Sequence, residues 1–288
     1  MKYGIGIDIG GSHVSGGIVD LMAGKLLKDS YREYPINPLA PSDEILDNWM
    51  TLILNIIGNN TLISKIGFAM PGPFDYERGI ALFKGVPKYT HLYGLPVRTI
   101  LTNRLVQETG RNFELQFIND ATAFALGEYA FGAAQEMSKC WILTLGTGLG
   151  STFLQNGTPQ LTGRRMPKGG YLYNQPYKDG IADEYFSTRW FVKQYPGIAS
   201  VKELVILAIK GDKKALDLFC LFAQNLAAFL SPWLKKTQAE GIIIGGGIAH
   251  AWEYFHPTLV SEIQKADINI IIKRATLGGT APILGALT

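Results

Sequence analysis

Alternating apolar and polar residues predict that the chain begins with two β-strands joined by a tight turn. The strands cover Tyr3–Ile9 and Val14–Asp20, and residues 10–12 of the turn read Gly-Gly-Ser. Glycine permits backbone angles that a side chain forbids, so the N–H groups of this turn can approach a ligand closely. Asp8 lies at the end of the first strand. An acid, two glycines and a hydroxyl on one hairpin fit a metal-bound phosphate group.

The same pattern returns in the second half of the chain. Cys140–Leu145 is an apolar run, residues 146–151 read Gly-Thr-Gly-Leu-Gly-Ser, and Thr152–Leu154 begins another strand. Two hairpins of one design predict a duplicated fold with a phosphate-binding turn in each half. The alternative is that glycine-rich turns are simply common in β proteins. Both turns carry hydroxyl groups and the first carries Asp8, which favours the phosphate interpretation.

Between and after the hairpins, strand-like runs alternate with helical periodicity. In the first half, the sequence predicts strands at Lys25–Tyr34, Lys65–Met70 and Leu115–Ile118, and helices at Asp43–Ile57 (with Ser42 as N-cap), Pro96–Gly110 and Ala121–Ala130. In the second half, it predicts helices at Asp183–Tyr195, Val201–Ile209, Lys213–Lys235, Glu253–Lys265 and Gly279–Leu287, and strands at Gly241–Ile244 and Ile268–Ile272. This alternation is typical of α/β folds with a mixed sheet and flanking helices.

Candidate site residues follow the predicted strands. Ligands of such sheets bind at the carboxyl ends of the strands. The residues at these ends are Asp8, Pro71, Gly72, Asn119, Asp120 and the turn of residues 146–148. Their common position predicts a functional site at the carboxyl ends of the strands.

Composition narrows the class of protein. Of 288 residues, 47% are hydrophobic and 18% charged, which is typical of a globular chain. The net charge of +3 and the absence of any Lys/Arg run longer than two residues argue against nucleic acid as a partner. Cys140 and Cys220 are expected to be buried thiols. No signal peptide or membrane-spanning run is recognisable, so we expect a cytoplasmic protein without a membrane partner.

Several ordered motifs resemble the ROK family (repressors, open reading frames and kinases) along essentially the whole chain. They are DIGGS at Asp8–Ser12, AMPGPFD at Ala69–Asp75, INDATAFALGE at Ile118–Glu128, LGTGLGS at Leu145–Ser151, IIIGGGI at Ile242–Ile248 and GTAPILGAL at Gly279–Leu287. The resemblance implies the actin-like ATPase (ribonuclease H-like) fold, with two duplicated α/β domains and a cleft between them. The first would span residues 1–118, joined by the C-terminal helix at 280–288, and the nucleotide-side domain residues 119–279.

The resemblance also implies a glucokinase-like sugar kinase that uses ATP and Mg²⁺. Asp120 is similar to the family's catalytic aspartate, a general base toward the sugar hydroxyl. The alternative is an acid that only caps the helix after it. The other implied roles are Asn119, Pro71 and Gly72 at the sugar; Asp8 at Mg²⁺, directly or through water; Gly10, Gly11, Ser12, Thr147 and Gly148 at the phosphates; and Gly246 and Gly247 at the adenosine.

The sequence departs from the family in the sugar-binding region. Family kinases carry a GExGH signature whose Glu and His contact sugar hydroxyls, and here Tyr171 and Asn174 stand at those positions. The family's zinc-binding cysteines are missing, since no cysteine occurs between 141 and 219. Asp183 occupies the place of a later sugar-binding Glu, and either keeps part of that role or is a solvated acid at a helix start. Arg164 and Arg165 would attract an anionic acceptor or a polyphosphate donor, or lie in a solvated loop.

Three functions therefore stay open. The first is a kinase acting on a hexose or amino sugar. The second is a sugar sensor, because the family includes repressors. These carry an extra N-terminal DNA-binding domain, whereas the hairpin here starts at residue 3, so we expect no DNA binding unless a partner supplies it. The third is a regulatory subunit without catalysis, which the retained Asp120 argues against. Family members are frequently dimers, so a homodimer is an expectation from resemblance alone.

Overall fold

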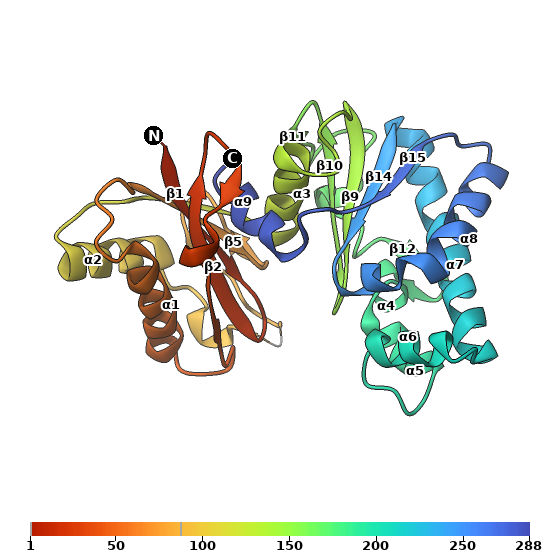
Figure 1. Ribbon diagram of the computed structural model, residues 1–288, viewed down its shortest axis with the longest axis horizontal. Coiled ribbons are helices and arrows are strands. Elements are labelled where there is room, and N and C mark those ends of the chain that lie inside the picture. Colours follow the sequence, from red (N-terminus) through yellow and green to blue (C-terminus); the bar gives the residue numbers. More distant parts are fainter. Residues whose placement is uncertain (1, 87) are drawn as a thin grey trace. The chain divides into compact units, whose positions relative to one another are not determined.

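The computed structural model describes residues 2–86 and 88–288, and the chain forms two compact units. Unit 1 contains the described residues up to Phe131 together with Gly279–Thr288, and unit 2 contains Gly132–Gly278. Each unit is an α/β structure built on one mixed sheet (Figure 1). Unit 1 extends through residue 131, whereas the sequence-based boundary was placed at 118. The residues between belong to a helix that packs within unit 1.

Unit 1 is organised around the first hairpin. Its elements are β1 (Tyr3–Ile9), β2 (His13–Asp20), β3 (Lys25–Leu26), β4 (Arg32–Pro35), α1 (Ser42–Ile57), β5 (Lys65–Met70), β6 (Phe74–Asp75), β7 (Ile80–Ala81), α2 (Val97–Thr109), β8 (Glu114–Asn119), α3 (Asp120–Phe131) and α9 (Ala281–Gly285). The sheet runs β3-β2-β1-β5-β8, with β4 also paired to β2. β1 is antiparallel to β2 and parallel to β5, which is parallel to β8.

Unit 2 repeats this topology. Its elements are β9 (Lys139–Leu145), β10 (Leu149–Gln155), β11 (Thr158–Pro159), β12 (Pro176–Tyr177), β13 (Gly180–Ile181), α4 (Ala182–Tyr185), α5 (Thr188–Gln194), α6 (Val201–Ile209), α7 (Lys213–Thr237), β14 (Gly241–Gly245), α8 (Trp252–Lys265) and β15 (Ile271–Arg274). The sheet order is β11-β10-β9-β14-β15, with β10 antiparallel to β9, and β9, β14 and β15 parallel. The duplication predicted from the two hairpins is therefore confirmed, and the fold is the actin-like ATPase fold.

In unit 1 the C-terminal helix α9 packs directly onto the sheet. A Cβ atom on Gly6 of β1 would lie 2.0 Å from the carbonyl oxygen of Ile283, and one on Gly67 of β5 2.0 Å from that of Ala286. Both distances are far below contact, so only glycine lets this segment approach the strands so closely. Residues 281–286 therefore cover one face of β1 and β5 in unit 1.

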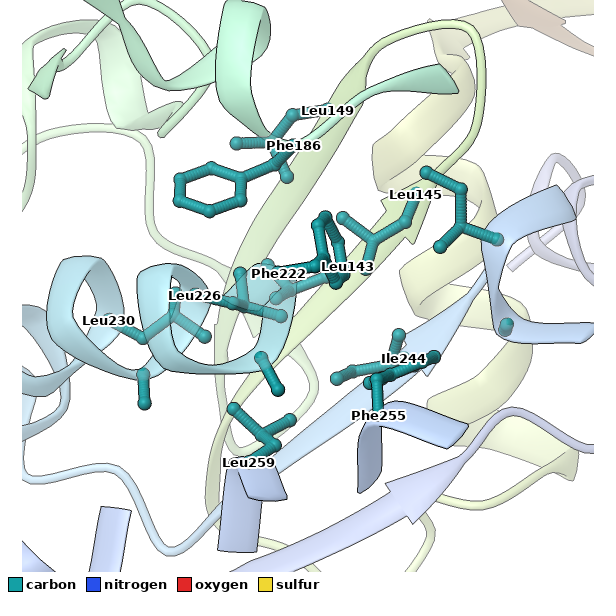
Figure 2. Close-up of a cluster of buried hydrophobic side chains, with 14 of the residues drawn as sticks. Leu143, Leu145, Leu149, Phe186, Phe222, Leu226, Leu230, Ile244, Phe255 and Leu259 are labelled. Carbon is teal, nitrogen blue, oxygen red and sulfur yellow. The ribbon is translucent and has the colours of Figure 1, made fainter. Parts of the chain in front are cut away.

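The core of unit 2 lies between its sheet and the helices α7 and α8. Figure 2 shows Phe222 and Leu226 of α7, Phe255 of α8 and Leu143 and Ile244 of the sheet in one apolar cluster. Within the described residues, α7 is the one helix long and apolar enough to cross a bilayer, and more than half of its apolar stretch is buried in the structure. Such burial is typical of the core helix of a globular unit.

Three predicted elements differ from the structure. Lys25–Tyr34 is not one strand, because the Ser30 hydroxyl accepts a hydrogen bond from the Ile18 amide (2.8 Å) and donates one to the Leu27 carbonyl (2.6 Å), which stabilises a 3₁₀ turn at Lys28–Ser30. The helix predicted at Asp183–Tyr195 breaks into α4 and α5. The last strand lies at Ile271–Arg274, where β14 sets its register.

Two smaller predictions were also wrong. Pro41 and not Ser42 is the N-cap residue of α1, whose first helical residue is Ser42. Cys140 is buried as expected, but Cys220 is exposed. The periodicity of α7 explains the second result, because its buried face carries Phe219, Phe222 and Leu226 and leaves residue 220 on the outer side.

Candidate functional site

The glycine turn of unit 1 is held by three hydrogen bonds and stays open at its tip. The Gly10 amide donates to the His13 carbonyl (3.0 Å), and the Gly10 carbonyl accepts from the buried Tyr89 hydroxyl. The Ser12 carbonyl accepts from the Ile36 amide (3.0 Å). Gly11 is exposed, and a Cβ there would meet nothing closer than the Lys88 side chain at 4.0 Å. A ligand can therefore reach this backbone.

Two carboxyl groups share the carboxyl edge of the sheet beside this turn. Asp8 comes at the end of β1 and Asp120 directly after β8. Burial, and next the nearby charge of Asp120, raise the pKa of Asp8 to about 7, while Lys88 opposes the rise. Burial also raises the pKa of Asp120; Lys88 and hydrogen bonds from the Ala121 amide (2.8 Å) and the Asn119 side chain (3.0 Å) counteract it. The charge of Lys88 therefore does not fully offset the burial of Asp8 and Asp120.

Asn119 provides the cap that the sequence assigned as an alternative role to Asp120. Its Oδ1 accepts from the Thr122 amide (3.2 Å), three residues along α3, which is the bond of an N-cap. Its Nδ2 donates to Asp120 and to the Tyr76 hydroxyl (3.2 Å). Among the described residues, the second carboxylate oxygen of Asp120 accepts no hydrogen bond. Asp120 is thereby oriented by its neighbours but keeps an oxygen for a ligand.

Pro71 and Gly72 lie near Asn119, and the Tyr76 hydroxyl lies between Gly72 and Asn119. Pro71 is buried and Gly72 exposed, and a Cβ on Gly72 would lie 3.4 Å from the Tyr76 hydroxyl. That hydroxyl also donates to the Met70 carbonyl at the end of β5 (3.3 Å). The structure thus gathers all the unit 1 candidates at one edge. It adds Lys88 and Tyr76, which the sequence did not single out because both lie in a stretch without periodicity.

The unit 1 edge fits a magnesium ion. Two partly buried carboxyl groups with raised pKa values gain a compensating charge when a divalent cation binds. No cluster of three or more His, Cys, Asp or Glu side chains that could hold a metal occurs among the described residues. A metal here would therefore take few protein ligands and several waters or substrate oxygens, which is the habit of Mg²⁺.

The glycine turn of unit 2 is braced by the segment that follows β13. The Gly146 carbonyl accepts from both the amide (2.7 Å) and the hydroxyl (3.0 Å) of Thr188. The Leu149 amide donates to Oδ1 of Asp183 (2.7 Å), and Oδ2 of Asp183 pairs with Arg189. Asp183 is therefore not a solvated helix-start acid, because both oxygens have protein partners. Thr147, between these anchors, is exposed.

Gly246 and Gly247 lie next to this turn, at the carboxyl end of β14. Gly246 has φ +85°, and a Cβ there would lie 2.5 Å from the Leu145 carbonyl oxygen, so no other residue fits. A Cβ on Gly146 would lie 3.9 Å from the Gly247 amide, whereas one on Gly247 would meet nothing within 4 Å. The two predicted nucleotide turns are therefore neighbours, with open space beside the second.

Tyr171 and Asn174 belong to unit 2 and lie near Asp183. The Asp183 amide donates to the Tyr173 carbonyl (2.9 Å), and the Leu172 amide donates to the Ser151 hydroxyl (2.8 Å), which attaches this segment to β10. Tyr171 is partly buried, and Asn174 is exposed with its Oδ1 accepting from Gln175. The residues that replace the family's Glu and His thus lie beside the acid that follows them in the chain.

Arg164 and Arg165 lie elsewhere. They line a cavity of about 260 Å³ together with Lys139 and Gln155, which pair at the amino end of β9. The turn of residues 146–148 lies at the opposite end of that strand. Both arginines are exposed, which fits the interpretation of a solvated loop, and their cavity lies at the other end of β9 from the phosphate turn.

Comparison with known proteins agrees with this geometry. The model of the ROK family matches residues 4–288. The chain belongs to the ROK family. Among its ROK relatives, a glucokinase from Thermotoga maritima is 28% identical, covering 86% of this chain and 83% of its own. An N-acetyl-D-glucosamine kinase from Mannheimia succiniciproducens is 26% identical over 98% and 97%. The crystal structure of a ROK hexokinase from Thermus thermophilus has a TM-score of 0.75 at 25% identity, covering 99% of this chain and 96% of that one.

Proposed function

We propose that this ROK protein is an ATP- and Mg²⁺-dependent carbohydrate kinase that phosphorylates a hydroxyl of a hexose or amino sugar. The observation that carries the proposal is Asp120, a carboxyl group at a strand end with one oxygen free and the other fixed by Asn119 and the Ala121 amide. The relatives named above act on glucose and N-acetylglucosamine, which supports the substrate class.

In the proposed reaction Asp120 accepts the proton of the sugar hydroxyl as that oxygen attacks the γ-phosphorus and the bond to ADP breaks. General-base help of this kind contributes about 10²- to 10⁴-fold. A buried carboxyl group with a raised pKa is a stronger base than an exposed one. The charge of Lys88 opposes this rise in the pKa of Asp120.

The phosphates would be held by backbone turns and a metal. Asp8 would hold Mg²⁺, which neutralises charge on the phosphates during transfer. The Gly10–Ser12 turn and the turn of residues 146–148 offer backbone to the phosphates, and Gly246 and Gly247 offer it to the adenosine. Phosphoryl transfer is mostly positioning and charge stabilisation, so these groups are sufficient.

Sugar selection would rest on Asn119, Pro71, Gly72, Tyr171 and Asn174. Tyr171 and Asn174 change the hydrogen-bonding groups available for the sugar, and we assign them to specificity. A regulatory protein without catalysis is less well supported, because Asp8 and Asp120 both stand at the edge of the sheet. We further propose that the protein is a cytoplasmic homodimer that binds neither nucleic acid nor membranes.

The test is ADP release with Mg·ATP across glucose, mannose, N-acetylglucosamine and N-acetylmannosamine. Turnover with one sugar should fall at least about 100-fold in Asp120→Asn, since the variant cannot take up the proton. The control is Asp47→Asn, which changes an exposed acid of α1 that pairs with Arg104 of α2. This variant should keep full activity. Sugar binding without turnover in the wild type, with any of the four sugars, would instead favour a sensor.

A further inference from the structure

We infer that Asp183 is a positioning residue for the nucleotide-phosphate turn of unit 2 and does not bind the sugar. The inference rests on the proposed function for what the turn holds, but the bracing itself is a property of unit 2. It reassigns an acid that stands where the family has a sugar-binding Glu.

The first argument is that the carboxylate of Asp183 is committed to protein partners. Oδ1 accepts from the Leu149 amide at 2.7 Å, and a Cβ on Gly148 would lie 2.8 Å from the same oxygen. Oδ2 pairs with Arg189. The side chain of Asp183 is 22% exposed. A sugar hydroxyl would have to share an oxygen whose direction is already set by a protein donor.

The second argument is that the same short segment fixes both ends of the turn. Thr188 holds the Gly146 carbonyl at the start, and Asp183 holds the Leu149 amide at the end. The Thr188 amide donates to Gly146, so it cannot donate to the carbonyl four residues earlier, and this is where the predicted helix breaks into α4 and α5. The hydrogen bond from Thr188 to Gly146 therefore both interrupts the helix and holds the turn.

The third argument concerns charge. An unpaired carboxylate next to a phosphate-binding turn would repel an anionic ligand. Arg189, which is 67% exposed, supplies the neutralising charge from the solvent side. Asp183 can therefore shape the turn without disturbing a polyphosphate in front of it. Arg189 is the second positioning residue.

The experiment compares Asp183→Asn, Arg189→Met and Arg189→Lys with a matched control, Glu184→Gln. Glu184 is the neighbouring acid on α4 and caps the Ile181 amide (3.2 Å) without touching the turn. The readouts are hydrogen exchange at the Leu149 amide, the Kd of Mg·ATP, and the Kd of whichever sugar the wild type phosphorylates.

In Asp183→Asn the Leu149 amide should exchange at least about tenfold faster, because a charged acceptor is replaced by a neutral one. The Kd of Mg·ATP should rise about tenfold, and the Kd of the sugar should stay within about twofold. Arg189→Met should weaken Mg·ATP binding while Leu149 stays protected, and Arg189→Lys should restore it because it keeps the charge. Glu184→Gln should match the wild type in all three.

A rise in the Kd of the sugar, with unchanged exchange at Leu149, would overturn the inference and return Asp183 to the sugar site. Unchanged exchange with unchanged binding would overturn it as well. Failure of the proposed function looks different, because a wild-type protein that binds no nucleotide leaves exchange at Leu149 as a direct measure of the brace. Melting temperatures of the variants show that each is folded.

Discussion

The two glycine turns have the same backbone plan but differ in where their acid comes from. In unit 1 the acid, Asp8, lies on the strand that enters the turn. The equivalent residue of β9 is Thr144, since Ile9 and Leu145 each form the last pair of their hairpins. In unit 2 the acid is Asp183, which arrives from a later helix. The two units therefore share the turn but not the acid on the strand that enters it.

The electrostatics of the two acids differ accordingly. Asp8 faces a second carboxyl group, Asp120, and burial raises its pKa to about 7. Asp183 faces Arg189 and a backbone donor. An acid that lacks a partner gains from a bound cation, whereas a paired one does not. The difference fits the proposal that the unit 1 turn lies beside a magnesium ion, whereas the acid beside the unit 2 turn already has protein partners.

The largest effect is expected when Asp8, the acid of the unit 1 turn, loses its charge. Asp8→Asn should lower kcat/KM about 100-fold, because it removes the proposed magnesium ligand and about 2.7 kcal/mol of transition-state stabilisation. The matched change, Thr144→Asn at the equivalent strand position, should cost less than about threefold. Steady-state kinetics over a range of Mg²⁺ concentrations measures both. Equal losses in the two variants would remove the assignment.

The raised pKa of Asp8 also makes a prediction for stability. Its folded-state pKa lies above that of an unfolded chain, so its contribution is present at acidic pH and is lost as the pH rises to about 7. The metal-free wild type should therefore lose melting temperature relative to Asp8→Asn between pH 5 and pH 8. Adding Mg²⁺ at pH 8 should recover the loss only in the wild type. A pH series of melting curves with and without Mg²⁺ tests this.

The third prediction uses the space next to one glycine of each turn. Gly148→Ala should reduce the free energy of unfolding by about 1–3 kcal/mol, because the new Cβ would lie 2.8 Å from the Asp183 carboxylate. Gly11→Ala should be close to neutral, since its Cβ would meet nothing nearer than 4.0 Å. Chemical denaturation compares the pair. A destabilised Gly11→Ala with a neutral Gly148→Ala would reverse the comparison.

The fourth prediction concerns Lys88, which lowers the pKa of both Asp8 and Asp120. Lys88→Met should raise both pKa values and move the acidic limb of the kcat/KM profile upward by roughly one pH unit. Lys84→Met, in the same loop, is the control, because that ammonium lies over the Tyr93 ring. The profile of Lys84→Met should match the wild type, and any shift shared by the two variants would count against a specific role.

The smallest effect is expected from the hydroxyl that holds the first turn. Tyr89→Phe leaves the Gly10 carbonyl without its donor and should cost about 1 kcal/mol of unfolding free energy. Thr188→Val in unit 2 should cost less, because the Gly146 carbonyl keeps the Thr188 amide. Thermal unfolding of both variants decides between them. A larger loss for Thr188→Val would contradict the contacts of the two carbonyl groups.

Much of the fold could be predicted from periodicity, because strand ends and glycine turns carry local signals. β1, β5 and α6 were predicted with the bounds that the structure shows. The errors came where a side chain or backbone group binds something distant in sequence. Ser30 interrupts a strand by binding Ile18, and Thr188 interrupts a helix by binding Gly146. No local pattern records such partners.

The candidate site shows the same limit. Asp8, Asn119 and Asp120 could be located because they follow strands, and the structure gathers them at one edge. Lys88 and Tyr76 could not, because their loop has no periodicity that fixes where its side chains point. Asp183 was named as a candidate from its place in the sequence, but its partners, Leu149 and Arg189, could not be predicted because they depend on tertiary contacts.

The packing of α9 sets the order in which the chain can fold as it is synthesised. Gly6 and Gly67 leave room on β1 and β5 for the backbone of Ile283 and Ala286. During synthesis, the strands that flank Asp8 therefore stay uncovered on this face until Ile283 and Ala286 have been made. Unit 2, whose residues are contiguous, has no such delay. A nascent chain stalled before residue 279 should therefore present unit 2 folded and unit 1 still sensitive to protease.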